Sequence, residues 1–486
     1  MKEDNKKIVI LGAGLAGLAA GYELVKVGKK VIILEKNPYV GGLATTFKVG
    51  DYRFDTGPHR WFTKINEVDK WVKDLMGDEF INVARLTRIY FNKKFYYYPV
   101  RPLDALQGIG PLKAARAIFD FFLTKLSVKI NPEPIVTMED AYINQFGRTL
   151  YQIFFEKYTE KLWGRPCNKL SGDWVAQRSR GMSIMTIIRN AFFPQKGKVV
   201  SLVEEFSYPR LGVGRIAERL AEEIRKNGGE IILNAQISNI KLTRSKIDTP
   251  VLRDQISNVK SVSYRRNDKI EEISGDEFIS SIPLTSLVEY LDPLPPTKVL
   301  KAVKSLSFRN EVFVALFLKK GKITNDQWIY TQDPSLPFVR FLETDNWSSF
   351  LSPKGTTALV FEVACDEEDR VWQMGNKKLV DWITNKYINE FKTINKNDIA
   401  GSFIHHQQFE YPVYQIGYEK PLKVIKEYLK KIANLQIIGR SGMYRYNNMD
   451  HTIQSGIWAA RNLLGGNYNL ENINIEKEYH EEKKSA

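Results

Sequence analysis

A glycine-rich turn near the start of the chain constrains the fold more than any other feature of the sequence. Residues 7–11 (KIVIL) are a short apolar run that predicts a buried strand, and Gly12, Gly14 and Gly17 follow it in a GxGxxG pattern. The first glycine of such a pattern permits a tight turn, the second lets the backbone approach a pyrophosphate, and the third lets the next helix pack closely on the strand. That helix is predicted over residues 15–27, with its N-terminal N–H groups directed at the negative charge.

A second strand supplies the acid that such a site uses. Residues 30–34 (KVIIL) predict another buried strand, and Glu35 closes it. An acid at this position hydrogen-bonds a ribose 2′-hydroxyl and disfavours the 2′-phosphate of NADP. Strand, helix and strand form a βαβ unit with parallel pairing and a right-handed crossover. The sequence therefore predicts a dinucleotide site, although the glycine pattern alone does not separate FAD from NAD.

Length and composition are those of a globular protein with more than one domain. The 486 residues are 43% hydrophobic and 26% charged, enough for two or three domains with a buried core. The formal charge of +15 favours anionic partners, unless it is only a solvated basic surface. No recognition motif for nucleic acid accompanies this charge, so we expect a small-molecule substrate and no nucleic-acid partner.

The number of cysteines and the length of the apolar runs indicate the cellular location to expect. The chain has two cysteines, Cys167 and Cys365, with no CxxC motif, so we expect neither a disulfide framework nor a zinc site, and a cytoplasmic location. His405 and His406 have no accompanying cluster of acids or cysteines, and no metal is expected. No apolar run reaches about 18 residues, which predicts no transmembrane segment. Residues 111–126 (PLKAARAIFDFFLTKL) are amphipathic, which is compatible with peripheral membrane contact but more common in a helix packed on a core.

Periodicity along the rest of the chain predicts interleaved domains. We expect an α/β protein in which a Rossmann-like dinucleotide-binding domain alternates with a helical domain and an antiparallel-sheet domain. Helical, aromatic sequence is predicted over residues 66–188 and an amphipathic helix over residues 212–225. Strands are predicted at 229–240, 259–264, 278–282, 305–318, 356–363 and 434–438, with a final helix at 452–464. The binding domain is assigned to residues 1–65, 201–304 and 431–470, a mainly helical substrate domain to 66–200, an antiparallel-sheet substrate domain to 305–430, and a polar tail to 471–486.

Motifs at both ends of the chain distinguish the cofactor. A glycine pair, Gly41-Gly42, precedes residues 52–59 (YRFDTGPH), while Gly439-Arg440 and residues 449–453 (MDHTI) lie near the C-terminus. In this order the motifs resemble the flavin-contacting elements of the amine oxidase, protoporphyrinogen oxidase and UDP-galactopyranose mutase superfamily. The resemblance implies a flavoprotein of the GR2 type with FAD as its cofactor. The cofactor-binding residues that it implies are Gly12, Gly14, Gly17, Glu35, Gly42, Leu43, Gly57, Gly439, Arg440, Asp450 and Ile453.

Within that superfamily the chain is most similar to the UDP-galactopyranose mutases. Residues 157–164 (KYTEKLWG) resemble their active-site helix, and Trp174 with Arg178 and residues 337–340 (PFVR) resemble the segments that carry two phosphate-binding arginines. The resemblance implies that His59, Arg178, Arg340 and Tyr446 are catalytic. It also implies that Tyr98, Arg101, Tyr158, Trp163 and Asn448 bind substrate. Taken singly, Trp163 and Trp174 are more typical of a core.

The resemblance also implies a reaction. In these mutases the N5 atom of reduced flavin attacks the anomeric carbon of a nucleotide sugar, and the sugar ring recloses in its other size. Two arginines suit the diphosphate of such a substrate, and an electron donor must reduce the flavin. However, Asn448 replaces an acid common in short mutases, and residues 57–62 (GPHRWF) are similar to protoporphyrinogen oxidases and desaturases. An FAD-dependent oxidoreductase that takes hydride from its substrate therefore stays open as the alternative, as does a non-catalytic flavin scaffold.

Overall fold

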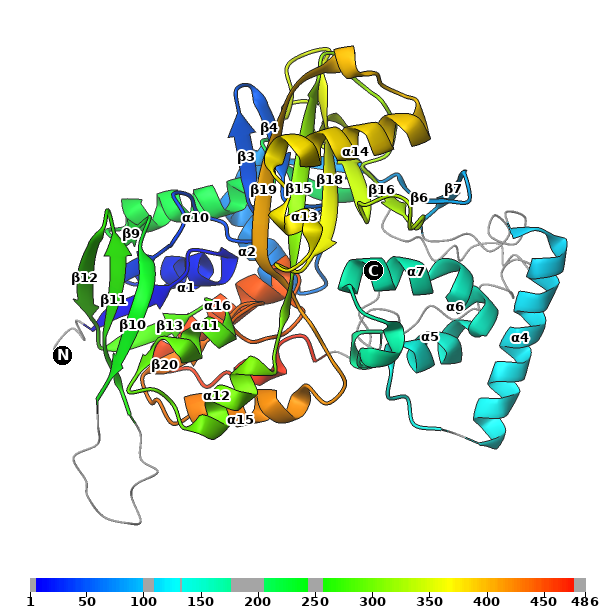
Figure 1. Ribbon diagram of the computed structural model, residues 1–486. Coiled ribbons are helices and arrows are strands. Elements are labelled where there is room, and N and C mark those ends of the chain that lie inside the picture. The colour runs from blue at the N-terminus through cyan, green and yellow to red at the C-terminus, as the bar shows by residue number, and fades with distance from the viewer. Residues whose placement is uncertain (1–5, 99–108, 132, 176–204, 244–256, 476–486) are drawn as a thin grey trace.

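A five-stranded parallel sheet organises one side of the molecule (Figure 1). The computed structural model describes residues 6–98, 109–131, 133–175, 205–243 and 257–475. The strand order is β20-β13-β1-β2-β9, and every neighbouring pair is parallel. The strands are β1 (Lys7–Leu11), β2 (Lys30–Leu34), β9 (Glu230–Ile232), β13 (Glu277–Ser280) and β20 (Leu435–Ile437). Three distant parts of the chain thus build one sheet, and the predicted Rossmann-like, interleaved fold class is confirmed.

Helices pack closely on this sheet because small residues line their contacts. Helix α1 (Leu15–Val25) packs against α16 (Met449–Leu463) and α10 (Arg215–Lys226). A Cβ atom on Gly456 of α16 would lie 2.2 Å from the carbonyl oxygen of Ala16, and one on Gly17 would lie 2.0 Å from that of Gly12. No side chain fits at such distances, so these glycines set the spacing of the two helices and of the first turn.

A smaller sheet and three helices complete this side of the molecule. The four-stranded sheet has the order β12-β11-β10-β14. Its strands are β10 (Gln236–Leu242), β11 (Val259–Arg266), β12 (Lys269–Ser274) and β14 (Leu291–Asp292). The helices are α11 (Leu284–Glu289), α12 (Thr297–Lys304) and α15 (Glu419–Leu429). The strand predicted over residues 229–240 is in fact two, β9 in the parallel sheet and β10 in the smaller one.

A seven-stranded sheet with the order β19-β15-β18-β17-β16-β6-β7 rises beside the parallel sheet. Its strands are β6 (Thr87–Phe91), β7 (Lys94–Tyr97), β15 (Phe308–Leu318), β16 (Trp328–Thr331), β17 (Arg340–Glu343), β18 (Thr357–Cys365) and β19 (Ile399–Pro412). Val312, Val314 and Leu316 of β15 pack with residues of α14 (Asn376–Phe391), while Phe313 and Ala315 face the core shared with the dinucleotide-binding side. Strand β15 is therefore buried on both faces.

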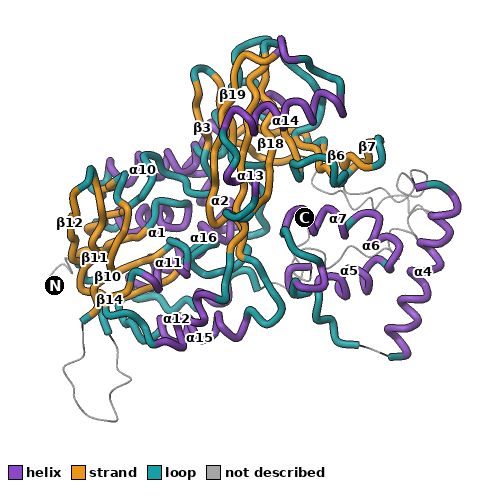
Figure 2. Tube along the Cα trace, viewed as in Figure 1, coloured by secondary structure: helices purple, strands orange, loops and turns teal. Residues whose placement is uncertain are grey.

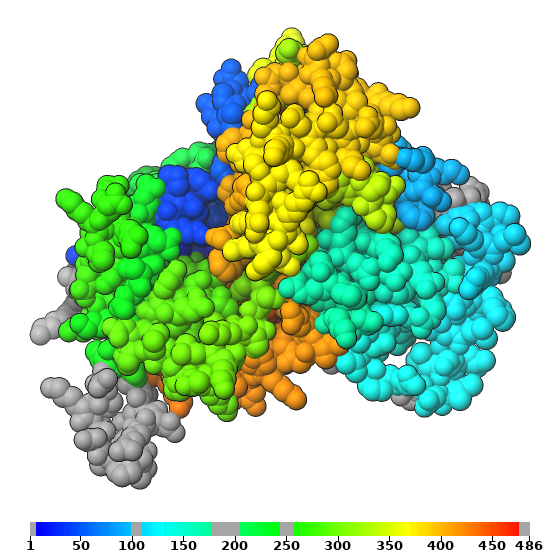
Figure 3. Space-filling view, in the orientation of Figure 1, coloured from blue at the N-terminus to red at the C-terminus, as the bar shows by residue number. Residues whose placement is uncertain are grey.

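The helical region forms a lobe on the far side of the seven-stranded sheet (Figures 2 and 3). It contains α4 (Pro111–Ile130), α5 (Met138–Phe146), α6 (Arg148–Phe154) and α7 (Glu156–Trp163). The prediction that residues 66–188 are helical is wrong at three places, because β5 (Phe80–Ala84), β6 and β7 interrupt it. Strand β5 pairs with β8 (Glu205–Pro209), and β6 pairs with β16. These partners are remote in sequence, so local periodicity could not reveal them.

The remaining elements are short connections. They are α2 (Asn66–Met76), α13 (Arg370–Gln373), the hairpin strands β3 (Thr46–Val49) and β4 (Tyr52–Asp55), and the 3-10 helices η1 (Gly77–Glu79), η2 (Cys167–Lys169), η3 (Thr344–Asn346), η4 (Lys396–Asp398) and η5 (Leu470–Asn472). The predicted helix and strand boundaries elsewhere differ from the structure by a few residues.

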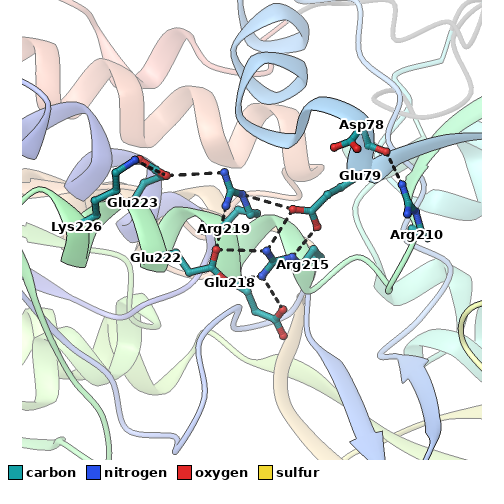
Figure 4. Close-up of polar contacts among 9 residues, drawn as sticks. All are labelled: Asp78, Glu79, Arg210, Arg215, Glu218, Arg219, Glu222, Glu223 and Lys226. Carbon is teal, nitrogen blue, oxygen red and sulfur yellow. Dashed lines mark hydrogen bonds and ion pairs between the residues drawn. The ribbon is translucent and has the colours of Figure 1, made fainter.

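An ion-pair network joins α10 to η1 (Figure 4). Arg215 contacts Glu79 through Nε at 2.6 Å and Glu222 through Nη1 at 2.5 Å. Arg219 also reaches Glu222, at 3.1 Å. The carboxylates of this network are partly exposed, so water and salt screen the contacts. Each ion pair therefore contributes at most about 1 kcal/mol to stability. The network links α10 to η1 and adds little to the stability of the fold.

Candidate functional site

A cavity of 740 Å³ connects the glycine-rich turn with the helical lobe. At one end it is lined by Gly12, Gly14, Glu35, Gly42 and Leu43. At the other end it is lined by Tyr158, Trp163, Arg340, Tyr446 and Asn448, and His59 also lines it. Residues predicted from widely separated motifs are thus brought to one cavity.

The dinucleotide end is built from backbone. Gly14 is the N-cap of α1, and the N–H of Gly41 donates to the carbonyl oxygen of Ala13 at 2.9 Å. Gly42 has φ +60°, and a Cβ atom placed on it would lie 3.2 Å from the Cα atom of Gly14. The two glycines therefore face each other with no side chain between them. This leaves open backbone at a helix N-terminus, the arrangement that accepts a pyrophosphate.

Glu35 is held in place by backbone N–H groups. Its Oε2 atom accepts a hydrogen bond from the N–H of Ala13 at 2.8 Å, and Oε1 accepts one from Asn37 at 2.9 Å. Burial raises the pKa of Glu35, and these two N–H donors partly oppose that effect. Each carboxylate oxygen retains a further lone pair towards the cavity that it lines. This geometry suits a ribose hydroxyl.

Arg440 brings a positive charge to the same cavity. Its guanidinium carbon lies 4.3 Å from the ring centroid of Tyr446 and 4.7 Å from that of Tyr411, and the two rings are nearly parallel, with an interplanar angle of 5°. Its Nε and Nη2 atoms are buried and have no hydrogen-bond partner among the described residues. A guanidinium with unused donors suits an anionic ligand. The open glycines, Glu35 and Arg440 together fit a dinucleotide such as FAD.

Four predicted cofactor residues do not line the cavity. Gly17 packs against Gly12, as described above. Gly57 has φ +109° and borders the ring of His59, and Ile453 is fully buried in the core. Asp450 is buried and accepts a hydrogen bond from the backbone N–H of His451 at 2.8 Å. These four shape the elements around the cavity instead of forming its wall.

Neighbouring strands of the seven-stranded sheet place three glutamates around Arg340. On β17 and β18, Arg340 and Glu362 are directly paired, and the Nε atom of Arg340 donates to Glu362. Glu311 on β15 and Glu410 on β19 complete the group, and all three glutamates are buried. Nη2 of Arg340 donates to the hydroxyl of Tyr411 at 3.1 Å. We refer to Glu311, Glu362, Glu410 and Arg340 as the acid–arginine cluster.

The protonation of this cluster follows from its burial. Burial raises the pKa of Glu362 to about 7, although Arg340 opposes the shift. The pKa of Glu311 is raised well above its ordinary value, by burial and then by repulsion from Glu362. Burial also raises the pKa of Glu410. Like charges in one buried site cannot all ionise, so the cluster holds protons near neutral pH.

These acids were missed by the sequence analysis. Each lies in or at the end of an apolar or aromatic strand sequence, for example Glu311 in RNEVFVALFL and Glu362 in TALVFEVAC. An acid at a buried position of a strand requires a partner, and that requirement is a usable signal. The sequence does not reveal the strand order that brings these glutamates together.

His59 lies half-buried beside the cluster and is uncharged. Burial, together with the positive charges of Arg440 and Arg340, lowers its pKa to about 3. Its Nδ1 atom has no hydrogen-bond partner among the described residues. A neutral imidazole can donate or accept a hydrogen bond in the cavity but does not supply a proton at neutral pH.

Aromatic rings form the wall nearest the helical lobe. Tyr158 meets Tyr330 edge-on with ring centroids 5.8 Å apart, and Tyr98 lies 5.1 Å from Tyr330. Trp163 packs edge-on against Trp174 at 5.7 Å. Trp163 is therefore both a packing residue and part of the wall. Arg101 and Arg178, also predicted for this end, lie outside the described residues.

Lys161 of α7 fixes the loop that leads to Arg340. Its Nζ atom donates to four carbonyl oxygens: Thr331 at 2.7 Å, Asp333 at 3.0 Å, Phe338 at 3.1 Å and Leu336 at 3.3 Å. These carbonyls belong to the end of β16 and to its connection with β17, which begins at Arg340. The lysine of the KYTEKLWG motif thus positions a binding residue on another element.

Comparison with known proteins places this architecture in a class. Residues 10–77 match the NAD(P)-binding Rossmann-like domain family. The crystal structure of reduced UDP-galactopyranose mutase superimposes with a TM-score of 0.81, at 21% identity, over 97% of this chain and 98% of that one. The chain has the fold of the FAD-dependent flavoenzymes that include the amine oxidases, protoporphyrinogen oxidases and UDP-galactopyranose mutases.

Two further proteins represent the oxidase side of this fold. A protein from Exiguobacterium sp. 255-15, provisionally assigned as a protoporphyrinogen oxidase, superimposes with a TM-score of 0.68, at 15% identity, over 95% of this chain and 99% of that one. By sequence, the chain is 22% identical to coproporphyrinogen III oxidase of Bacillus subtilis (strain 168) over 465 residues, 88% of this chain and 92% of that protein. These similarities establish the fold, and the dinucleotide end described above fits FAD.

Proposed function

We propose that the protein is an FAD-dependent nucleotide-sugar isomerase of the UDP-galactopyranose mutase kind. The observation that carries this proposal is the extent of the structural similarity to the reduced mutase, with a TM-score of 0.81 over 97% of this chain. The similarity to the Exiguobacterium protein on the oxidase side is lower, at 0.68. Because the mutase similarity includes the helical lobe and both large sheets, it covers the walls of the cavity as well as the nucleotide-binding region.

Charged and phenolic groups of the cavity suit a nucleotide diphosphate. Arg340 can donate to phosphate oxygens, and the hydroxyl groups of Tyr411 and Tyr446 add donors. Tyr98 and Tyr330 can stack on a nucleobase, and Trp163 offers an apolar surface to a sugar. Reduced flavin, when bound, supplies a nucleophilic nitrogen for the anomeric carbon. The protein then has to bind and orient the substrate and to exclude water.

Substrate binding on Arg340 would compete with Glu362. In the structure the guanidinium already donates to this carboxylate and to Tyr411. A proton on Glu362 would weaken that ion pair and leave more of the positive charge for a diphosphate. The neutral ring of His59 would add a hydrogen bond without adding charge. We infer that the buried glutamates set how much positive charge Arg340 presents to the substrate, and that they do not act on the substrate themselves.

A net oxidoreductase is the second candidate. It is supported by the sequence similarity to coproporphyrinogen III oxidase, at 22% identity over 465 residues. The two candidates therefore differ in the ligand that they predict and in the redox state in which product forms.

The discriminating experiment is a spectral titration of the purified holoprotein with UDP and UDP-galactose, oxidised and then reduced with dithionite. The isomerase proposal expects a saturable change in the flavin spectrum and conversion of the sugar only in the reduced state. Failure to bind either ligand in both states would contradict it. Reduction of the flavin by an added porphyrinogen or amine, with no response to UDP, would establish the oxidoreductase.

A further inference from the structure

Helix α4 presents large apolar side chains to the outside of the molecule. Leu112 is 87% exposed, Phe119 65%, Leu123 48%, Leu126 55% and Ile130 74%. At 100° per residue these positions share one stripe along the helix. The opposite stripe, Ala114, Ala117 and Phe121, is buried. A helix that only packs on a core is polar on its outer side, whereas this one is apolar on both sides.

Basic residues border the apolar stripe. Lys113, Arg116 and Lys129 are exposed, and the sequence of α4 contains one acid, Asp120. That acid is directed to the neighbouring helix, because its Oδ2 atom accepts a hydrogen bond from the backbone N–H of Thr149 at 2.6 Å. The outer surface of α4 therefore combines apolar contact area with positive charge, in a chain whose formal charge is +15.

The position of α4 allows contact with an extended surface. It forms the outer edge of the helical lobe (Figures 1 and 3). Ile135 and Val136, which follow it in the chain, are also 52% and 48% exposed. At 1.5 Å per residue the helix is about 30 Å long, so it offers a continuous contact line. In the described parts of the chain, no helix is long and apolar enough to cross a bilayer.

We infer that α4 docks on an anionic lipid surface, with its apolar stripe in the headgroup region and its basic residues against the lipid phosphates. A second copy of this chain is the poorer occupant, because two such stripes would bring Arg116 and Lys129 against like charges with no acid to pair them. Helix α4 packs on α5 and α6, whose residues Tyr142 and Phe154 line the cavity. A bilayer on α4 would therefore contact the lobe that carries one wall of the active site.

The test is co-sedimentation of the holoprotein with vesicles of phosphatidylcholine, alone or with 30% phosphatidylglycerol, at low and high salt. We expect the anionic vesicles to bind roughly tenfold more protein than the neutral ones, since each basic residue near such a surface adds about a fivefold preference before screening. The Phe119→Glu/Leu123→Glu variant should lose at least roughly tenfold of this binding, because its apolar contact is removed.

Matched variants keep the result interpretable. Ile270→Glu changes a 70% exposed isoleucine on β12 and should bind vesicles as the wild type does. Arg116→Gln/Lys129→Gln leaves the apolar stripe intact, and it should lose the preference for anionic lipid even if the glutamate variant folds poorly. Equal binding of all variants would overturn the inference. So would a wild-type dimer in light scattering that Phe119→Glu/Leu123→Glu converts to a monomer, since a second copy would then cover α4.

Discussion

The two ends of the cavity are built in different ways. The dinucleotide end consists of backbone and small residues from one local βαβ unit, supported by Glu35 and Arg440. The other end consists of long side chains from several strands, from α7 and from the segment before α16, and Arg340 and Glu410 of the acid–arginine cluster line it. A site made of backbone loses its ligand when a side chain is added at any position. In a site made of side chains, single substitutions can change the affinity stepwise. The experiments below test this difference.

The largest effect is expected at Gly14. A Cβ atom there would meet only the Cα atom of Gly42, at 4.0 Å, so the protein without cofactor should tolerate Gly14→Val. The side chain would instead fill the space of the pyrophosphate and abolish FAD retention. Flavin absorbance per protein, with circular dichroism as the folding check, measures this. Gly17→Val is the contrasting control, because its side chain would collide with the carbonyl of Gly12 and prevent folding. A Gly14→Val protein that purifies yellow would refute the assignment of the dinucleotide end.

The next effect is expected at Arg340. Replacing it with alanine should weaken binding of a nucleotide diphosphate by roughly 2–5 kcal/mol, because Glu362 is left buried and unpaired and the phosphate loses a donor. Flavin content should stay unchanged, which separates the two ends of the cavity. Calorimetric titration with UDP measures the loss, and Arg340→Lys, which retains the charge but not the fork, should recover part of it. Normal UDP binding by Arg340→Ala would show that the substrate lies elsewhere.

A smaller effect is expected at Lys161, which contacts no ligand in our proposal. Lys161→Met would remove this donor from four carbonyl oxygens of residues 331–338, of which that of Phe338 keeps the hydroxyl of Thr331, and each buried unsatisfied group costs about 1–3 kcal/mol before relaxation or hydration. We expect a lower melting temperature and weaker UDP binding, with FAD retained. Lys161→Arg is the conservative comparison. Unchanged UDP affinity in Lys161→Met would mean that the loop holds Arg340 without this lysine.

The smallest effect is a dependence on pH. Because burial raises the pKa of Glu362 to about 7, its carboxylate forms as the pH rises through 7 and then competes for Arg340. In this range His59 is already neutral and Glu311 keeps its proton, whereas Lys161, whose pKa burial lowers to about 7, also changes charge. Affinity for UDP-galactose should therefore fall with rising pH, by up to about tenfold per unit above 7. Glu362→Gln should flatten this profile, and an unchanged slope in that variant would exclude Glu362 as the titrating group.

The same raised pKa has a consequence for folding. The folded protein holds the Glu362 proton more tightly than the unfolded chain, whose glutamate has the ordinary value of 4.5. This contribution to stability is fully present below pH 4.5 and is lost as the pH rises to about 7. Thermal melts of the wild type and Glu362→Gln between pH 5 and 8 should converge towards the acid end.

The dinucleotide end could be expected from the sequence because its determinants are local. Gly12, Gly14 and Glu35 lie within one strand–helix–strand unit, so spacing alone indicates their roles. The acid–arginine cluster was not predicted, because Glu311, Glu362 and Glu410 come together only through the order of β19, β15, β18 and β17. Strand pairing between distant segments also explains why β5 and β6 were taken for helix, whereas β7 pairs with β6 in a local hairpin that was overlooked. The domain boundaries and the substrate roles of Tyr98, Tyr158 and Asn448 stay predictions.

The late position of β20 in the chain has a consequence for biosynthesis. This strand completes the parallel sheet next to β13, and the Gly439-Arg440 turn and α16 follow it, with α16 packed on α1. During synthesis, the N-terminal glycine turn therefore leaves the ribosome long before the residues that face it have been made. An N-terminal fragment ending before residue 435 would lack Arg440 and the helix that covers α1. Acquisition of FAD is thus a closing step of maturation, and arrested chains should emerge colourless.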